Sequence, residues 1–210
     1  VFRNPSLGLA EFPMPKLGPG EVLIRSRSCG VCGSDVHMCE RDADGYVAYG
    51  DHTKLPVVLG HEWAGEVSAV GSGVEALRPG DPVCVEPNNW CGACTACRSG
   101  MPNQCANLEE IGFTRDGGLA EYGVAQARYC WKLDALAPAY GSADQVYEAG
   151  ALVEPCAVAY NALFVRAGGF LPGGAVAVFG AGPIGLVSIA LARVAGAGLI
   201  ITLETSSERR

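Results

Sequence analysis

Residues 175–185 have the sequence A-V-A-V-F-G-A-G-P-I-G, and this stretch decides the fold of the C-terminal part of the chain. Ala175–Phe179 is a continuous apolar run, as expected for a strand that is buried on both faces of a parallel sheet. Residues 184–195 have the length and composition of a helix. Glycines at 196 and 198 end that helix, and a second apolar run follows at Leu199–Leu203. The stretch therefore predicts one βαβ unit.

A glycine motif of the form G-x-G-x-x-G lies between the first predicted strand and the helix, at Gly180, Gly182 and Gly185. The first glycine permits a tight turn, the second lets a pyrophosphate approach the backbone, and the third lets the helix pack close to the strand. Free N–H groups at the helix start attract phosphates. Pro183 and Ile184 complete the motif, and proline is tolerated there because its missing N–H would have no helical partner. The context predicts a dinucleotide-binding loop.

Glu204 directly follows the second predicted strand, 24 residues after Gly180. A carboxylate at this position accepts hydrogen bonds from the adenosine ribose and repels a 2′-phosphate, which favours NAD over NADP. A solvated charge at a strand end is the alternative interpretation. Arg209 and Arg210 follow closely and are cations that could serve a phosphate.

Four cysteines within fifteen residues have the spacing C-x2-C-x2-C-x7-C, at Cys91, Cys94, Cys97 and Cys105. Four such thiolates can close around one Zn²⁺ as a tetrahedral structural site. The chain has ten cysteines in all, so a secreted protein with five disulfides is the alternative. The clustered spacing favours metal binding instead, and with it a reducing compartment, the cytoplasm.

The composition places the 210-residue chain among globular proteins, because 49% of the residues are hydrophobic and 18% are charged. The net charge of −7 comes without a basic stripe, which argues against a nucleic-acid partner. No apolar run reaches membrane-spanning length, and the first residues lack the apolar core of a signal peptide. The chain does not begin with Met and ends soon after the second predicted strand, so we expect it to be incomplete.

The first 150 residues or so are rich in glycine, proline and short runs of β-type residues. Turn signals separate four candidate strands, at residues 21–27, 63–70, 81–86 and 119–124. Many short strands with such punctuation indicate a barrel or a partly open β domain. Residues 149–166 then have few glycines or prolines and favour helices.

Two further segments connect these motifs to a known family. They are C-G-V-C-G-S-D-V-H at residues 29–37 and G-H-E-W-A-G at residues 60–65. Together with the four cysteines and the glycine motif, they resemble the zinc-dependent medium-chain dehydrogenase/reductase (alcohol dehydrogenase) family over essentially the whole chain. The resemblance is strongest to its polyol branch, the sorbitol and threonine dehydrogenases, and within it to inositol-type members. Residues 44–46, 110–113 and 152–155 add to that likeness.

The resemblance implies a fold of class α/β plus β. Residues 1–156 would form a GroES-like, β-rich, zinc-binding catalytic domain. Residues 157–210 would begin a Rossmann domain, a doubly wound parallel sheet that is incomplete in this chain.

The resemblance also implies a second, catalytic zinc. Its first two ligands would be Cys32 and His61. In the polyol branch the third ligand is a Glu before Pro, which corresponds to Glu154, with Cys156 as a rival and a water-bridged carboxylate as an alternative. Glu62 would lie beside the metal and exchange with its water. From the residues alone these are suitable zinc ligands, but their sequence separation does not prove that they converge.

Three residues near the first ligand have implied roles in catalysis. Ser34 would begin a proton relay, and His37 would pass the proton outward. Asp35 would orient the zinc histidine. The alternatives are a turn residue for Ser34, a surface histidine for His37 and a helix cap for Asp35.

The implied activity is transfer of hydride between NAD and a secondary alcohol of a polyol or cyclitol, or the matching ketone. A simple alcohol or amino-alcohol dehydrogenase on the same scaffold is the alternative. A zinc-free reductase fits poorly because the cysteines are present, and a non-catalytic zinc protein is a further alternative. The implied cofactors are two Zn²⁺ per chain and NAD(H). The implied partners are a small-molecule substrate and further copies of the chain, as a dimer or tetramer.

Substrate recognition is expected in the loop at residues 38–55, between the two segments of the predicted catalytic zinc site. Its many hydrogen-bonding groups would suit a polyhydroxylated substrate; they are Asp42, Asp44, Tyr46, Tyr49 and His52. A solvated surface loop is the alternative.

Overall fold

The computed structural model describes residues 7–40, 43 and 53–210. The chain divides into two compact units, Val1–Ala151 and Leu152–Arg210, and each is described by itself. The domain boundary expected after residue 156 stays a prediction. The five hydrogen-bonding residues expected to recognise substrate lie outside the described residues; they are Asp42, Asp44, Tyr46, Tyr49 and His52.

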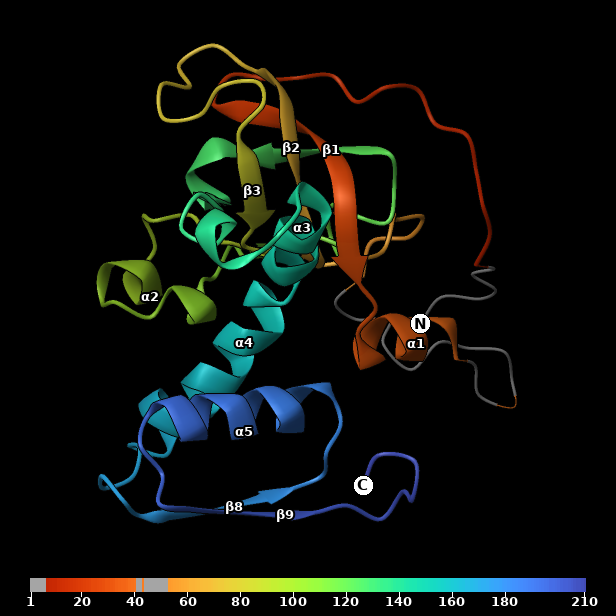
Figure 1. Cartoon of the computed structure of the whole chain (residues 1–210). Coiled ribbons are helices and arrows are strands. Elements are labelled where there is room, and N and C mark those ends of the chain that lie inside the picture. Colours follow the sequence, from red (N-terminus) through yellow and green to blue (C-terminus); the bar gives the residue numbers. More distant parts are fainter. Residues whose placement is uncertain (1–6, 41–42, 44–52) are drawn as a thin grey trace. The chain divides into compact units, whose positions relative to one another are not determined.

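The first unit is built on β-strands with short helices between them (Figure 1). Its strands are β1 (Glu21–Gly30), β2 (Glu62–Val70), β3 (Pro82–Val85), β4 (Asn88–Asn89), β5 (Glu109–Glu110), β6 (Tyr122–Gln126) and β7 (Cys130–Lys132). Its α-helices are α1 (Gly33–Cys39), α2 (Thr95–Arg98) and α3 (Ala143–Ala151). Single 3₁₀ turns occur at Pro102–Gln104, Ala127–Tyr129 and Ala137–Ala139.

Five of these strands form one antiparallel sheet in the order β6-β1-β2-β3-β7. β4 and β5 form a separate two-stranded ribbon. β1 is the longest strand, and it pairs with β6 on one side and with β2 on the other. At its C-terminal end Gly30 pairs with Glu62, so the chain leaving β1 and the chain entering β2 lie side by side. This register positions the site described below.

Both faces of the sheet are covered by apolar side chains. On one face Trp63, at 1% exposure, lies in a cluster with Val22, Ile24, Val67, Leu77, Val83, Val85, Ile111 and Ala125. On the other face α3 packs against the sheet through Val146, Tyr147 and Ala151. Gly150 lets this helix approach closely, because a Cβ there would lie 2.5 Å from Leu133 Cδ1. Burial of these side chains is the main stabilising term of the unit.

The second unit begins with helical structure, namely α4 (Val153–Tyr160) and a π-helical turn (Asn161–Arg166). It then forms β8 (Ala175–Phe179), α5 (Pro183–Val194) and β9 (Leu199–Leu203). β8 and β9 pair in parallel, in register from Ala175 opposite Leu199 to Phe179 opposite Leu203. The predicted βαβ unit is therefore confirmed.

One prediction about this sheet is wrong. We expected strands buried on both faces, but in β8 only Val178 is buried, and Phe179 is 79% exposed. Leu199, Ile201 and Leu203 of β9 are about half exposed. The reason is that this parallel sheet has two strands in the described chain, and α5 is the helix that packs against both of them.

The strand expected at residues 119–124 begins later, because β6 starts at Tyr122. The N–H groups just before it are used elsewhere. Gly117, Gly118 and Leu119 donate to the carbonyls of residues 58–60 rather than to a strand of the sheet. Backbone groups that are paired in this way cannot also form the ladder of a strand.

Candidate functional site

Three of the predicted metal ligands converge in the first unit. One donor atom from each of Cys32, His61 and Glu62 lies within 4.8 Å of the others. Cys32 directly precedes α1, His61 directly precedes β2, and Glu62 is the first residue of β2. The pairing of Gly30 with Glu62 brings these segments together across β1 and β2. A thiolate, an imidazole and a carboxylate are donors that Zn²⁺ accepts, so this set fits the ion that the sequence predicts.

Asp35 links the segments that carry these donors. Its carboxylate accepts a hydrogen bond from the Cys32 N–H at 2.8 Å and one from the Gly60 N–H at 3.3 Å. Its Oδ1 also lies 3.6 Å from His61 Nδ1. The side chain is 3% exposed, so these contacts are shielded from water. At 3.6 Å the contact with His61 is too long for a hydrogen bond, and His61 Nδ1 has no hydrogen-bond partner among the described residues, so the role of Asp35 in orienting His61 stays a prediction.

The electrostatics of this cluster favour a bound cation. Burial raises the pKa of the Glu62 carboxyl, and the Asp35 carboxylate acts in the same direction, while His61 opposes them. The neighbouring Cys29 thiol has its pKa raised to about 12, mainly by burial and then by Asp35 and Glu62.

Ser34 and His37 occupy different environments on α1. Ser34 Oγ is buried and has no hydrogen-bond partner among the residues that the structure describes. His37 is exposed, and its Nδ1 lies 2.7 Å from Glu40 Oε2. The relay role of both residues stays a prediction. Glu154 is the second residue of α4 and belongs to the second unit, so its role as third ligand also stays a prediction.

Sequence reasoning assigned no role to Phe113, whose ring centroid lies 5.0 Å from that of His61. Phe113 belongs to a segment that supported the family resemblance, at residues 110–113. Nothing in the pattern of that segment indicated that its aromatic ring would lie against a predicted metal ligand.

The four-cysteine cluster also forms as predicted, and its four Sγ atoms lie within 4.8 Å of one another. Cys94 Sγ is 3.5 Å from Cys97 Sγ and 3.9 Å from Cys105 Sγ. Zn–S bonds of about 2.3 Å place the sulfurs of a tetrahedral site about 3.8 Å apart. The separations therefore fit a zinc ion. None of the ten cysteines forms a disulfide.

Backbone N–H groups prepare this cluster for negative charge. Hydrogen bonds from the Ala93 and Cys94 N–H groups and the Asn107 amide lower the pKa of Cys91 to about 6. Burial among its neighbours raises the pKa of Cys97 instead. Four adjacent thiolates repel one another, so the arrangement suits a bound cation.

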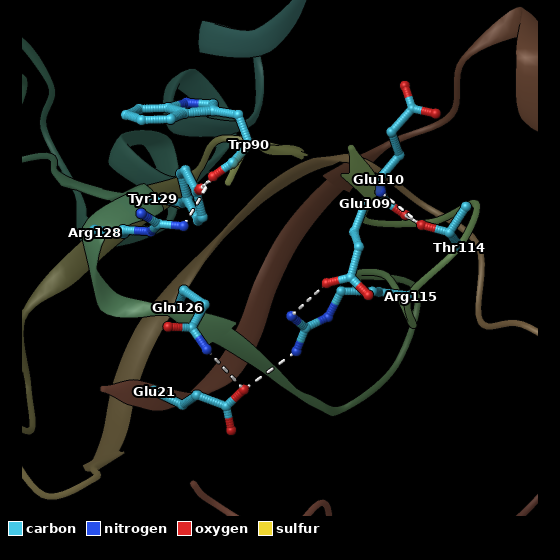
Figure 2. Close-up of polar contacts among 9 residues, drawn as sticks. All are labelled: Glu21, Trp90, Glu109, Glu110, Thr114, Arg115, Gln126, Arg128 and Tyr129. Atoms are coloured by element: carbon cyan, nitrogen blue, oxygen red, sulfur yellow. Dashed lines mark hydrogen bonds and ion pairs between the residues drawn. The ribbon is translucent and has the colours of Figure 1, made fainter. Parts of the chain in front are cut away.

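A second set of contacts joins Trp90, at the start of the cysteine segment, to the 3₁₀ turn at Ala127–Tyr129 (Figure 2). The Arg128 guanidinium donates to the Trp90 carbonyl at 2.8 Å, and the Tyr129 hydroxyl donates to the same oxygen. The guanidinium also lies 4.6 Å from the Tyr129 ring centroid and 5.4 Å from that of Trp90. Trp90 directly precedes Cys91, so these contacts hold the start of the cysteine segment.

In the second unit the glycine motif has the geometry that a phosphate loop requires. Gly180 has φ = +97°, which permits the tight turn after β8. Gly182 is the N-cap residue of α5, and Pro183 and Ile184 begin that helix. A Cβ on Gly185 would lie 2.0 Å from the Gly180 carbonyl oxygen, so only glycine allows this close packing. The predicted roles of the first and third glycines match this geometry.

Glu204 lies against the same loop. Its carboxylate accepts hydrogen bonds from the Ala181 N–H at 2.7 Å and the Ser206 N–H at 2.8 Å. These two N–H groups lower the pKa of Glu204, and the Ser206 N–H has the larger effect of the two. The side chain is therefore a carboxylate. Arg209 Nη1 lies 4.0 Å from Glu204 Oε2, and the same atom would be 3.4 Å from a Cβ on Gly182. Both residues therefore border the loop where the sequence predicts a dinucleotide.

Together, these features define a class of protein in which a β-rich unit with two clusters of candidate metal ligands precedes a βαβ unit with a glycine-rich loop. Residues 18–135 match the family described as the alcohol dehydrogenase GroES-like domain. The chain belongs to this family, and the fold class expected from the sequence is confirmed.

Individual proteins agree with this assignment. The chain is 45% identical to scyllo-inosose 3-dehydrogenase of Thermotoga maritima over 100% of its length and 55% of that protein. It is 39% identical to L-threonine 3-dehydrogenase of Pyrococcus horikoshii, covering 96% of this chain and 54% of the other. A short chain alcohol dehydrogenase of Escherichia coli, solved with NADH, matches with a TM-score of 0.80 and 33% identity over 99% of this chain and 56% of the other.

The chain spans about half the length of the curated relatives that it matches. Within the described ranges, no helix combines the length and the apolar character that crossing a membrane requires.

Proposed function

We propose that this chain is part of an NAD-dependent zinc oxidoreductase. It would transfer hydride between the cofactor and a secondary alcohol of a polyol or cyclitol, or the matching ketone. The observation that carries the proposal is the convergence of Cys32, His61 and Glu62 on one point in a family of alcohol dehydrogenases. The glycine loop with Glu204 beside it supports NAD as the cofactor.

We assign two zinc ions to the chain. Cys32 and His61 would hold the catalytic ion together with Glu154, and Glu62 would lie beside it. Cys91, Cys94, Cys97 and Cys105 would hold the structural ion. When bound, the catalytic zinc supplies Lewis acidity that favours ionisation of a substrate hydroxyl, and NAD supplies the hydride acceptor.

The residues around the catalytic site have distinct tasks in this proposal. Asp35 fixes the orientation of His61 and the position of the Cys32 backbone through its three contacts. Ser34 would begin the proton relay: its hydroxyl would accept the substrate proton while its own proton leaves outward, and the buried position of Oγ keeps that transfer away from bulk water. His37 is exposed and passes the proton to solvent.

Glu204 would select the cofactor. Its carboxylate is ionised and is held at the edge of the glycine loop, where the adenosine ribose of a dinucleotide lies in such folds. A 2′-phosphate at this edge would meet a negative charge, which favours NAD. Arg209 beside it would contact the dinucleotide on the side of Gly182.

The substrate class rests on the relatives. The identity to a scyllo-inosose dehydrogenase favours a cyclitol or polyol, and the lower identity to a threonine dehydrogenase supports an amino alcohol as the second candidate. We further propose a homo-oligomer, and a cytoplasmic location that suits ten unpaired cysteines.

The test is NADH formation by the intact, zinc-loaded protein on myo-inositol, scyllo-inosose, sorbitol, threonine and a simple secondary alcohol. We expect turnover on the cyclitols or sorbitol. Turnover on threonine alone would select the second candidate. A protein that binds two zinc ions and NAD but oxidises none of these compounds would refute the substrate class. A protein that binds neither cofactor would refute the function.

A further inference from the structure

A tight turn at residues 110–115 packs against the segment that carries His61. Its N–H groups at Phe113, Thr114 and Arg115 all donate to the Glu110 carbonyl, at 2.8–3.1 Å. Thr114 Oγ1 accepts a hydrogen bond from the Glu110 N–H at 2.7 Å, which closes the turn (Figure 2). These hydrogen bonds hold the turn in one conformation, so the position of one of its residues depends on the position of the others.

This turn and the residues after it press against the segment that presents His61. Gly112 has φ = +82°, and a Cβ there would lie 3.0 Å from the Gly60 backbone. The Gly118 N–H donates to the Gly60 carbonyl at 2.8 Å. Phe113 places its ring 5.0 Å from the His61 ring, between centroids. The imidazole is thus supported by the turn on one side and approached by Asp35 at its Nδ1.

One cation fastens the turn to the sheet. Arg115 Nη2 lies 3.2 Å from Glu21 Oε1 on β1, and its Nη1 lies 3.4 Å from Glu109 Oε2 on β5. Gln126 on β6 donates to the same Glu21 oxygen at 3.2 Å. Figure 2 shows the guanidinium between the two carboxylates. The Glu21 side chain is 15% exposed, so this is a partly buried pair.

We propose that Arg115 is a positioning residue for the metal ligand His61. By tying the 110–115 turn to β1, its guanidinium keeps Phe113 against the imidazole and Gly112 against Gly60. The inference rests on the proposed function, because it requires a metal ion at Cys32, His61 and Glu62. Within the described part of the chain, Arg115 pairs with Glu21 and Glu109 rather than with Cys32, His61 or Glu62, so it acts through the turn.

Removal of the guanidinium would do more than weaken one contact. Glu21 and Glu109 would lose the cation between them, and a partly buried carboxylate left without its partner destabilises its surroundings. The turn would shift away from β1, and Phe113 would move with it. Substitutions of groups that orient a ligand typically cost about 10–100-fold in metal affinity or activity, and we expect about tenfold here.

The experiment uses the full-length protein with Co²⁺ at the catalytic site and Zn²⁺ at the four cysteines. The visible absorption spectrum of the bound Co²⁺ is recorded. Absorption bands that are absent from Cys32→Ala identify the cobalt ion at the catalytic site. We expect Arg115→Met to shift these bands and to weaken Co²⁺ binding about tenfold, while Arg115→Lys restores part of the affinity. Arg78→Met is the control. Arg78 also pairs with a carboxylate in this unit, that of Asp81, but it lies outside the 110–115 turn.

A double-mutant cycle with Phe113→Leu separates positioning from general stability. If Arg115 acts through the turn, Arg115→Met adds little to the loss of Co²⁺ affinity already caused by Phe113→Leu. Unchanged bands in Arg115→Met, or additive losses in the cycle, would overturn the positioning role alone. If the unsubstituted protein shows no bands that depend on Cys32, the proposed function and this inference both fail. Circular dichroism of each variant verifies that it is folded.

Discussion

The two metal-ligand clusters of the first unit are built in opposite ways. The four-cysteine cluster draws all its donors from fifteen consecutive residues, and short N–H···S bonds prepare the sulfurs. The Cys32 cluster draws its donors from separate segments that are brought together by the pairing of β1 with β2 and by the hydrogen bonds of Asp35. A local cluster depends on its ion to hold its shape, whereas a dispersed cluster depends on the sheet. Metal loss and backbone strain should therefore affect the two clusters differently.

The largest expected effect concerns the dispersed cluster. In the proposed function Cys32→Ser removes a thiolate donor of the catalytic zinc, an ion that would contribute several kcal/mol of transition-state stabilisation, so turnover should fall about a thousandfold. The melting temperature should change little, because the sheet holds this cluster. Initial rates of NADH formation and calorimetry on the same samples measure both quantities. A large drop in melting temperature would contradict the contrast between the clusters.

The next effect concerns the local cluster. Cys97→Ser removes one of four thiolates, and structural zinc binding contributes to folding energy directly, so we expect stability to fall on the order of 3 kcal/mol. The protein should retain one zinc per chain, measured by elemental analysis, and part of its turnover. Cys39→Ser is the control, because Cys39 is exposed and belongs to neither cluster. Loss of both zinc ions from Cys97→Ser would show that the clusters are not independent.

A glycine substitution probes the backbone that the dispersed cluster needs. Gly60 has φ = +95°, and a Cβ there would lie 2.6 Å from Cys29 Sγ and 2.7 Å from Leu119 Cγ. Gly60→Ala should cost about 2 kcal/mol or more in free energy of unfolding and should weaken catalytic zinc binding. Gly73→Ala is matched, since Gly73 has φ = +80° but nothing within 4 Å of its Cβ position. Equal zinc affinity in the two variants would show that Gly60 is not needed to position His61.

The smallest effect is a pH-dependent one and concerns Asp81, which directly precedes β3 in the sheet. Burial would raise the pKa of Asp81, but the Lys132 ammonium at 2.7 Å, the Arg78 N–H and the Arg78 guanidinium together hold it below its usual range. A carboxyl with a lowered folded pKa stabilises the fold above its unfolded pKa, about 3.9, and this contribution is lost as the pH falls through the folded pKa. Urea unfolding should show about 1 kcal/mol less stability near pH 3 than at pH 6 from this group.

Lys132→Met should reduce that pH dependence, because it removes the cation that favours the charged form of Asp81. Arg78→Met should reduce it less, since the Arg78 side chain is 84% exposed and its contact with Asp81 is longer, at 3.5 Å. A pH profile that is identical in Lys132→Met and the unsubstituted protein would exclude Asp81 as its source.

Local patterns in the sequence were enough to predict much of this molecule. The apolar runs that became β8 and β9, the helix between them and the four-cysteine spacing are each contained in a short segment. The burial of β8 could not be predicted in this way, because it depends on what covers the sheet. The start of β6 was misplaced because Gly117, Gly118 and Leu119 pair with residues 58–60, far away in sequence.

The dispersed site shows the same limit. The residues alone left open whether Cys32, His61 and Glu62 converge, and only the resemblance predicted it. Phe113 and Arg115 were missed altogether, because their contacts with His61 and Glu21 join positions about 50 and 90 residues apart in sequence, and no spacing rule covers such pairs. Glu154 remains a prediction.

The contacts of Asp35 have a consequence for the kinds of metal ion that this scaffold could be made to prefer. Asp35 holds the Cys32 and Gly60 backbones by their N–H groups, and these contacts do not involve the donor atoms of Cys32 or Glu62. Donors can therefore be exchanged while the frame around them is kept. Replacing the soft thiolate of Cys32 with a carboxylate would shift preference toward harder ions such as Mn²⁺. The position least open to redesign is Asp35, although no metal ion touches it in our assignment.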